Sequence, residues 1–184
     1  MRRSGFVLVG GSSSRMGRDK ALLPYRGERL VDHIARQVRG AAGSVTLVGA
    51  AERYGALGYR AISDKIAGRG PLGGVHAALS DTSAEWNLLV ACDMPRLEQA
   101  LLEGLLDRAG QLGCDCLVPL SAPNKVEPLC AVWRRSALAK IEAALHAGVL
   151  RMTDALQLLD THYWTGAAAC FANANTPREW ARHA

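Results

Sequence analysis

Short apolar runs alternate along this chain with longer segments in which apolar residues recur every three or four positions. The short runs are typical of buried strands, and the periodic segments are typical of amphipathic helices. The pattern predicts strands at Phe6–Val9, Val45–Val48, Arg60–Ile62, Asn87–Ala91, Cys116–Pro119, Leu129–Trp133 and Cys170–Ala172. It predicts helices at Leu30–Arg39, Leu72–Ser80, Glu98–Gln111, Ser136–Ala147 and Met152–Leu159.

Strands and helices that alternate in this way are typical of a three-layer α/β fold with a mostly parallel central sheet. The sequence contains neither an internal repeat nor a long linker, so we expect one domain over residues 1–184, long enough to bury its own core. In such sheets ligands bind beyond the carboxyl ends of the strands. The loops expected to carry function are therefore those after Val9, Val48, Ile62 and Ala91.

The composition is that of an ordinary soluble globular protein, with 49% apolar and 21% charged residues. Its five cysteines are odd in number and lack C-x-x-C pairs, which indicates reduced thiols in a reducing compartment. The apolar run after the basic N-terminus stops at Gly10, too early for a signal peptide, and no segment reaches the length of a membrane span. We therefore expect a cytoplasmic protein with no membrane partner.

The charge balance is basic, with a formal net charge of +5 and a pI near 9.2. Such a balance fits an anionic small ligand. Nucleic acid is the weaker interpretation, because the chain has only two Phe and four Tyr and no basic stripe interleaved with aromatic residues. We expect no nucleic-acid partner.

The segment Gly10–Lys20 (GGSSSRMGRDK) directly follows the first predicted strand and holds three glycines, three serines and three cations. Glycines let backbone N–H groups approach a ligand closely, and successive N–H groups that point inward form an anion-binding concavity. Arg15, Arg18 and Lys20 add full positive charge. The segment predicts a polyphosphate site; the alternative is a solvated Gly/Ser loop with incidental charges.

The spacing of this loop excludes two common phosphate-binding motifs. A P-loop requires Gly-x-x-x-x-Gly-Lys-Ser/Thr, whereas five residues separate Gly11 from Gly17 and Lys20 follows three residues later. A dinucleotide fingerprint requires Gly-x-Gly-x-x-Gly, which Gly10 and Gly11 followed by three serines do not supply.

Asp93 stands at the tip of the buried strand Asn87–Ala91. There it is suited to hold Mg²⁺, which takes one or two carboxylates together with phosphate oxygens and water. The alternative is the N-cap of the next helix, which Pro95 and the spacing to Glu98 disfavour. Cys92 is expected to be a small apolar filler rather than a nucleophile, since no base lies nearby in the sequence.

Asp64 follows the strand Arg60–Ile62 and precedes the glycine-rich turn Gly70–Gly74. Its carboxylate is placed to accept hydrogen bonds from a ribose or a base edge, and the glycines permit close approach of a ligand. The structural alternative is that Asp64 caps a turn while Gly73 and Gly74 only let the helix pack closely. Pro71 suits the first turn of that helix.

Two polar loops in the C-terminal half, at residues 124–129 and 171–177, flank predicted strands and are candidates for the acceptor half of a cleft. The second also fits an ordinary helix start at Thr176 and Pro177. The histidines lack ligand spacing and receive no role. A cationic glycine loop and a strand-end aspartate without a nucleophile–base pair point to phosphoryl or nucleotidyl transfer.

Five motifs in this order resemble the molybdenum cofactor guanylyltransferases, the MobA family of a nucleotidyltransferase superfamily. They are Leu8–Lys20, Gly70–Gly74, Cys92–Pro95, Glu127–Leu129 and Asn173–Pro177, and they span almost the full chain. The resemblance implies a Rossmann-like nucleotidyltransferase fold. It also implies that GTP and Mg²⁺ convert molybdopterin-bound molybdenum cofactor to its guanine dinucleotide form, with release of pyrophosphate.

The same resemblance assigns ligand residues by position. Leu8, Val9, Gly10 and Lys20 would contact the nucleotide, Asp64 would bind GTP, and Asp93 would bind both nucleotide and Mg²⁺. Two departures are Val9, where the family more often has alanine, and the loop after Val48, where a nucleotide-binding asparagine of the family has no match.

The mechanism that the resemblance implies is in-line attack by the terminal phosphate of the pterin on the α-phosphorus of GTP. Lys20, Arg15 and Asp93 are its catalytic residues, with Lys20 and Arg15 stabilising the departing pyrophosphate. We expect a monomer or weak oligomer in transient contact with molybdopterin-handling proteins. The alternatives are the cytidylyltransferase of the same cofactor, a sugar-phosphate nucleotidyltransferase, and a nucleotide-binding regulatory module without turnover.

Overall fold

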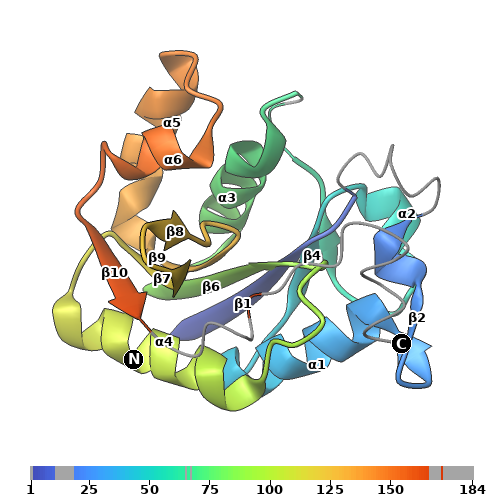
Figure 1. Cartoon of the computed structure of the whole chain (residues 1–184). Coiled ribbons are helices and arrows are strands. Elements are labelled where there is room, and N and C mark those ends of the chain that lie inside the picture. The colour runs from blue at the N-terminus through green and yellow to red at the C-terminus, as the bar shows by residue number, and fades with distance from the viewer. Residues whose placement is uncertain (1, 11–18, 65, 67, 166–170, 172–184) are drawn as a thin grey trace.

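A mostly parallel sheet forms the centre of the computed structural model, which describes residues 2–10, 19–64, 66, 68–165 and 171 (Figure 1). Within these residues eight strands make one sheet in the order β10-β7-β9-β6-β1-β4-β5, with β8 paired to β7. Only β8 and β9 run antiparallel to their neighbours. The strands are β1 (Arg3–Leu8), β4 (Thr46–Val48), β5 (Ala61–Ile62), β6 (Trp86–Ala91), β7 (Cys116–Ala122), β8 (Lys125–Val126), β9 (Cys130–Arg134) and β10 (Thr161–Thr165).

Helices cover both faces of this sheet, which confirms the three-layer prediction. On one face lie α1 (Leu30–Ala42) and α4 (Gln99–Leu112), and on the other lie α3 (Gly70–Asp81), α5 (Leu138–His146) and α6 (Met152–Leu156) (Figure 1). The short helix α2 (Ala51–Gly55) connects β4 to β5. In the described part of the chain no helix has the length and apolar character needed to cross a membrane.

Alternation along β1 supplies both layers of the core. Val7 packs among the residues under α1 and α4, whereas Phe6 packs among those under α3 and α5. Successive side chains of a strand point to opposite faces, so one apolar run serves two cores. Burying a side chain of this size contributes about 1.5–3 kcal/mol.

The parallel strands end level with one another. Leu8 at the end of β1 pairs with Val48 of β4 on one side and with Ala91 of β6 on the other, and Val48 pairs with Ile62 of β5. The loops predicted to carry function therefore leave the sheet along one line.

The structure adds elements that the hydrophobic pattern did not predict. These are α2, the hairpin of β2 (Pro24–Tyr25) and β3 (Glu28–Arg29), the short 3₁₀ helices at Lys20–Leu22 (η1) and Arg135–Ala137 (η2), β8 and the edge strand β10. β10 escaped prediction because most of its side chains are exposed or half-buried, so its sequence shows no apolar run. Of the predicted strand Cys170–Ala172 only Phe171 is described; it is buried and its backbone is 3₁₀-helical.

Gly49, just beyond the end of β4, lies against the backbone of Val9, just beyond the end of β1. A Cβ atom at this position would lie 2.3 Å from the carbonyl oxygen of Val9. The contact is fixed from both sides, because Val9 N–H donates to Val48 O at 2.9 Å and Gly49 N–H donates to Ile62 O at 2.8 Å. Only glycine fits between these backbones without moving one of them.

We therefore predict that Gly49→Ala lowers the free energy of unfolding by about 1–3 kcal/mol, the usual cost of forcing extra atoms into a packed site. The matched control is Gly104→Ala in the middle of α4, where a Cβ meets nothing within 4 Å. That change should raise stability by about 0.5–1 kcal/mol through helix propensity. Urea denaturation measures both, and a Gly49→Ala variant as stable as the parent chain would contradict the close-approach argument.

Candidate active site

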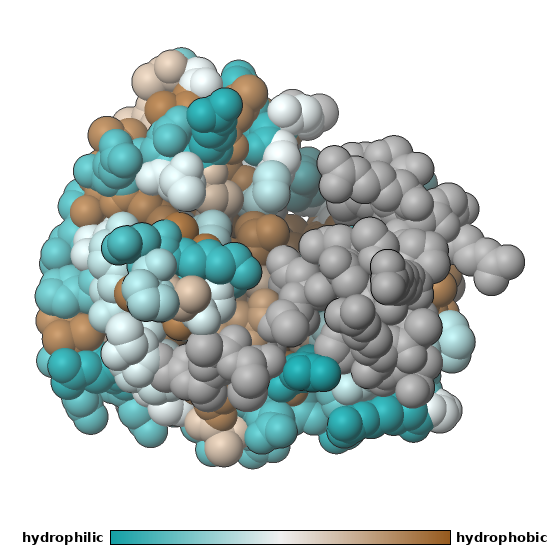
Figure 2. Space-filling view, viewed as in Figure 1, coloured by the Kyte–Doolittle hydropathy of each residue, from teal (hydrophilic) through white to brown (hydrophobic). Residues whose placement is uncertain are grey.

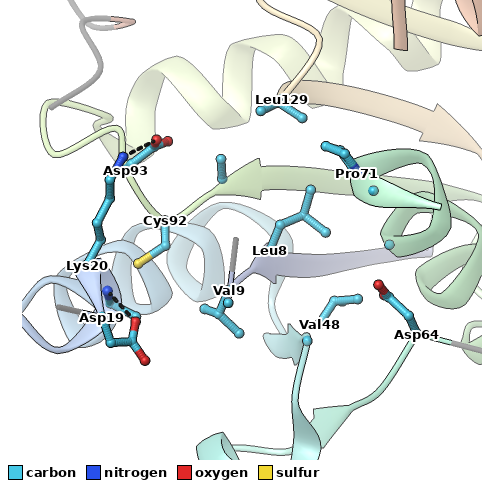
Figure 3. Close-up of a pocket in the computed structure, with 16 residues that line it drawn as sticks. Leu8, Val9, Asp19, Lys20, Val48, Asp64, Pro71, Cys92, Asp93 and Leu129 are labelled. Carbon is cyan, nitrogen blue, oxygen red and sulfur yellow. Dashed lines mark hydrogen bonds and ion pairs between the residues drawn. The ribbon is translucent and has the colours of Figure 1, made fainter. Parts of the chain in front are cut away.

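A pocket of about 540 Å³ opens where β1, β4, β5 and β6 end (Figure 3). In the space-filling view, hydrophobic residues lie in a hollow near the middle of the displayed face, with hydrophilic residues above it and to its left (Figure 2). The pocket brings together every sequence-predicted site residue that the structure describes. Its lining consists of Leu8, Val9, Gly10, Asp19, Lys20, Ala21, Val48, Gly49, Asp64, Gly70, Pro71, Gly74, Ala91, Cys92, Asp93 and Leu129.

The last residues of the strands supply the apolar part of this lining. Leu8, Val48 and Ala91 lie on the shared line of strand ends. Leu129 joins them from the loop before β9, where its carbonyl accepts a hydrogen bond from Ala91 N at 2.7 Å. Of the two polar loops proposed for an acceptor half, the 124–129 loop thus reaches the pocket through Leu129. An apolar surface of this kind suits the face of a flat ring.

Lys20 and Asp93 form the charged end of the pocket. The Lys20 ammonium lies 3.3 Å from Asp93 Oδ2, and about a fifth of each side chain is exposed (Figure 3). The second oxygen, Asp93 Oδ1, is buried and has no hydrogen-bond partner among the described residues. A buried charged oxygen without a partner is costly, so this atom has capacity for a ligand.

The helix-capping alternative for Asp93 is wrong. Helix α4 begins at Gln99, and its N-cap position is held by Glu98, whose side chain makes no capping bond. Asp93 instead lies two residues beyond the end of β6, with its side chain beside Lys20 rather than on a helix terminus.

Asp64 lies toward the other side of the pocket, after β5 and against the first turns of α3 (Figure 3). A Cβ atom built on Gly74 would lie 3.8 Å from Asp64 Oδ1 and 2.7 Å from Leu8 Cδ2. The glycine therefore lets α3 pack closely on β1 while it leaves room beside the carboxylate. Within the described residues no hydrogen bond to this carboxylate is present, so the turn-capping alternative finds no support there.

Partial burial raises the pKa of the Asp64 carboxyl above its usual value. Burial disfavours the charged form of an acid, and among the described residues no cation pairs with this carboxylate to offset the penalty. An ionised Asp64 therefore slightly lowers the stability of the folded chain. The same carboxylate is a hydrogen-bond acceptor at the pocket.

Cys92 is the apolar filler that the sequence predicted. Its side chain is buried within the core beside α1, and burial raises the pKa of its thiol far above the ordinary value. No histidine lines the pocket in the described part of the chain. The described lining thus contains no nucleophile–base pair.

Several predicted residues lie outside the described part of the chain. They include Arg15, assigned a catalytic role with Lys20, and Arg18 of the same loop. The Asn173–Pro177 motif lies outside it as well. Sequence reasoning in turn missed Gly49, although a glycine immediately after a predicted strand was a usable signal for close backbone approach.

Comparison with known proteins adds independent information. The model of the MobA-like NTP transferase domain matches residues 5–161. A probable molybdenum cofactor guanylyltransferase of Pelotomaculum thermopropionicum is 32% identical over 97% of this chain and 90% of its own length. A molybdenum cofactor guanylyltransferase of Pseudomonas paraeruginosa is 34% identical over 96% of this chain and 92% of its own.

Solved structures with the same fold include a protein of molybdopterin-guanine dinucleotide biosynthesis. Molybdopterin-guanine dinucleotide biosynthesis protein A of Archaeoglobus fulgidus superposes with a TM-score of 0.83 at 26% identity, covering 98% of this chain and 96% of its own. The 2-C-methyl-D-erythritol 4-phosphate cytidylyltransferase of Thermus thermophilus gives a TM-score of 0.75 at 18% identity, over 100% and 97% of the two chains. The second likeness concerns the nucleotidyltransferase fold alone.

The raised pKa of Asp64 implies that this residue affects folding stability in a pH-dependent way. Because the folded chain holds this proton more tightly than the unfolded chain, the ionised carboxylate costs stability at neutral pH, and the cost disappears as the pH falls through the acid range. Asp64→Asn should therefore melt at a higher temperature than the parent chain at pH 7, and the gap should close toward pH 4.

Asp154→Asn, at an exposed position of α6, is the matched control, since it removes the same charge from a surface carboxylate. It should show no such gain at pH 7. The measurement is the melting temperature of each ligand-free protein at both pH values. An Asp64→Asn protein that melts at or below the parent temperature at pH 7 would show that burial does not disfavour the charged carboxylate.

Proposed function

The chain belongs to the MobA-like NTP transferase family, and we propose that it is a molybdenum cofactor guanylyltransferase. In this reaction GMP passes from GTP to the molybdopterin-bound molybdenum cofactor, which gives the guanine dinucleotide form and pyrophosphate. Support comes from relatives with guanylyltransferase names at 30–39% identity, three of which align with almost the whole chain.

The distribution of charged and apolar residues along the pocket is the structural observation that best supports this proposal. The level ends of four parallel strands place Lys20 and Asp93 at one end of a pocket and Asp64 at the other, with an apolar lining between them. A nucleoside triphosphate has the same distribution of chemistry, with charge at one end, hydroxyls and a polar base edge at the other, and a flat ring. We infer that Lys20 and Asp93 face the phosphates and that Asp64 faces the nucleoside.

The residues at the charged end fit Mg²⁺. Asp93 Oδ1 is a buried carboxylate oxygen without a hydrogen-bond partner among the described residues. This is the pattern for Mg²⁺, which protein sites hold through one or two carboxylates plus substrate phosphates and water. Asp93 would hold the ion, which when bound neutralises charge on the phosphates.

The chain's own contribution to the reaction is positioning and charge. An oxygen of the pterin's terminal phosphate bonds to the α-phosphorus of GTP as the bond to the β-phosphate oxygen breaks, and pyrophosphate leaves with that electron pair. A phosphate nucleophile is already ionised near neutral pH, so no base is required. Lys20 stabilises the charge that develops on the leaving group. Arg15 is proposed to act with it.

The remaining features of the proposal concern the protein as a whole. We propose one nucleotidyltransferase domain over residues 1–184, cytoplasmic, acting as a monomer or weak oligomer. Its ligands are GTP and molybdopterin, it makes transient contact with molybdopterin-handling proteins, and it binds neither nucleic acid nor membrane.

A nucleotide panel tests the proposed reaction. The protein is incubated with Mg²⁺, the molybdopterin acceptor and each of GTP, CTP, ATP or UTP, and pyrophosphate release is measured. GTP should be preferred by at least about tenfold, a difference of about 1.4 kcal/mol. Preference for CTP would replace the proposal by the cytidylyltransferase, and tight GTP binding without release would replace it by the regulatory module.

Site variants test the assigned residues. Lys20→Ala and Asp93→Ala should each lower turnover by about 100-fold or more, the usual loss when a group that stabilises developing charge is removed. The fold should persist, since both side chains lie at the pocket rather than in the core. Lys140→Ala on α5, a half-exposed lysine paired with Asp115, is the control and should keep full activity. Retained turnover in both site variants would contradict the assignment of Lys20 and Asp93 as catalytic residues.

A further inference from the structure

Asp19 precedes Lys20 and uses both of its carboxylate oxygens for contacts within the protein. Asp19 Oδ1 accepts a hydrogen bond from Ala21 N at 3.1 Å and so caps η1, the turn that carries Lys20. Asp19 Oδ2 accepts one from the hydroxyl of Tyr54 at 2.8 Å. The Asp19 side chain is only 9% exposed. Although Asp19 lines the pocket, both of its carboxylate oxygens therefore make hydrogen bonds that hold the backbone of this turn.

Tyr54 is a rigid partner for this carboxylate. It lies in α2 and is fully buried, and a Cβ atom on Gly10 would lie 3.5 Å from its ring. Burial, followed by the hydrogen bond to Asp19, raises the pKa of the Tyr54 hydroxyl far above its usual value. The hydroxyl therefore stays protonated and donates to Asp19 at any working pH. Arg53 also approaches Asp19 Oδ2, at 3.4 Å, but it is 61% exposed, and exposed pairs contribute little.

Helix α2 is in turn fastened to the other end of the pocket. Ala51 N, at the start of α2, donates to Ser63 Oγ at 3.1 Å. Ser63 is the residue before Asp64. A continuous set of contacts thus runs from Lys20 through Asp19, Tyr54 and α2 to the loop that carries Asp64.

The turn η1 cannot supply this rigidity by itself. It has only three residues, and its own backbone bonds are Leu22 N to Asp19 O and Leu23 N to Lys20 O, both 3.1 Å. Short 3₁₀ turns are weakly stable alone because few hydrogen bonds offset the ordering of the chain. The buried Ala21 side chain packs this turn into the core beside α1, and the Asp19–Tyr54 hydrogen bond adds a side-chain anchor next to Lys20 itself.

We propose that Tyr54 is a positioning residue for catalysis, acting on Lys20 through Asp19 and η1. The inference rests on the proposed function, in which Lys20 stabilises the pyrophosphate leaving group. Tyr54 touches neither substrate nor reacting atoms. It holds the turn from which the Lys20 ammonium reaches Asp93, and small displacements of such a group cost large factors in rate.

A double-mutant cycle separates positioning of Lys20 from a merely structural role. Tyr54→Phe deletes only the hydroxyl and keeps the buried ring. In the parent background, Tyr54→Phe should lower kcat for pyrophosphate release about tenfold, while KM for GTP changes by less than about twofold. A tenfold change in rate is about the size expected when one hydrogen bond to a charged group is lost. In the Lys20→Ala background the same change should alter kcat by less than about twofold.

The matched control is Tyr59→Phe. The Tyr59 hydroxyl also donates to an aspartate, Asp32 Oδ1 at 3.0 Å, but neither residue lines the pocket. This control should keep the parent kcat. Asp19→Asn is the second variant should Tyr54→Phe fail to fold, since its amide oxygen still accepts from Ala21 N while its amide nitrogen cannot accept from Tyr54. Melting temperatures of all variants identify any loss of fold.

The outcomes distinguish this inference from the proposed function. Equal loss of kcat from Tyr54→Phe in both backgrounds, or no loss in either, would overturn the positioning role. If the parent protein binds GTP with Mg²⁺ but releases no pyrophosphate with any nucleotide, the proposed function fails, and the catalytic positioning role of Tyr54 fails with it; if the parent turns over but the cycle is additive, only the positioning role fails. A parent protein that does not bind GTP overturns both.

Discussion

The register of four parallel strands is the constraint on which the rest of this structure depends. Leu8 pairs with Val48 on one side and with Ala91 on the other, and Val48 pairs with Ile62, so all four strands stop on one line. Each loop that leaves this line then contributes a wall of the same pocket. A slip of one residue in any strand would turn its side chains to the opposite face and would move its loop along the edge. The packing of two cores against alternate residues of β1 is what prevents such a slip.

The apolar pattern predicted these strand ends because the same physics sets the core and the pocket. A strand buried on both faces must be apolar throughout, and its apolar run stops where the chain leaves the sheet. The positions of Gly10, Asp64 and Asp93 beyond those runs could therefore be derived from the sequence, and the structure brings all three to one pocket. β10 could not be derived in this way, because an edge strand with exposed side chains carries no apolar signal.

The contacts that hold the site were not predictable from the same pattern. Asp19 and Tyr54 are separated by 35 positions in the chain, and their hydrogen bond depends on how α2 folds back against the end of β1. α2 itself is a helix of five residues with a single buried side chain, too short to show a helical period. Likewise the close approach of Gly49 to Val9 arises from the pairing of two strands and appears in the sequence only as a glycine after an apolar run.

A crystal structure with GTP and Mg²⁺ bound would show whether the strand-end pocket holds a nucleoside triphosphate in one orientation. We expect electron density for the phosphates beside Lys20 and Asp93, with the nucleoside toward Asp64 and its ring against the apolar strand ends. Density for the nucleotide elsewhere on the molecule would contradict it. So would a reversed nucleotide, with its phosphates at Asp64.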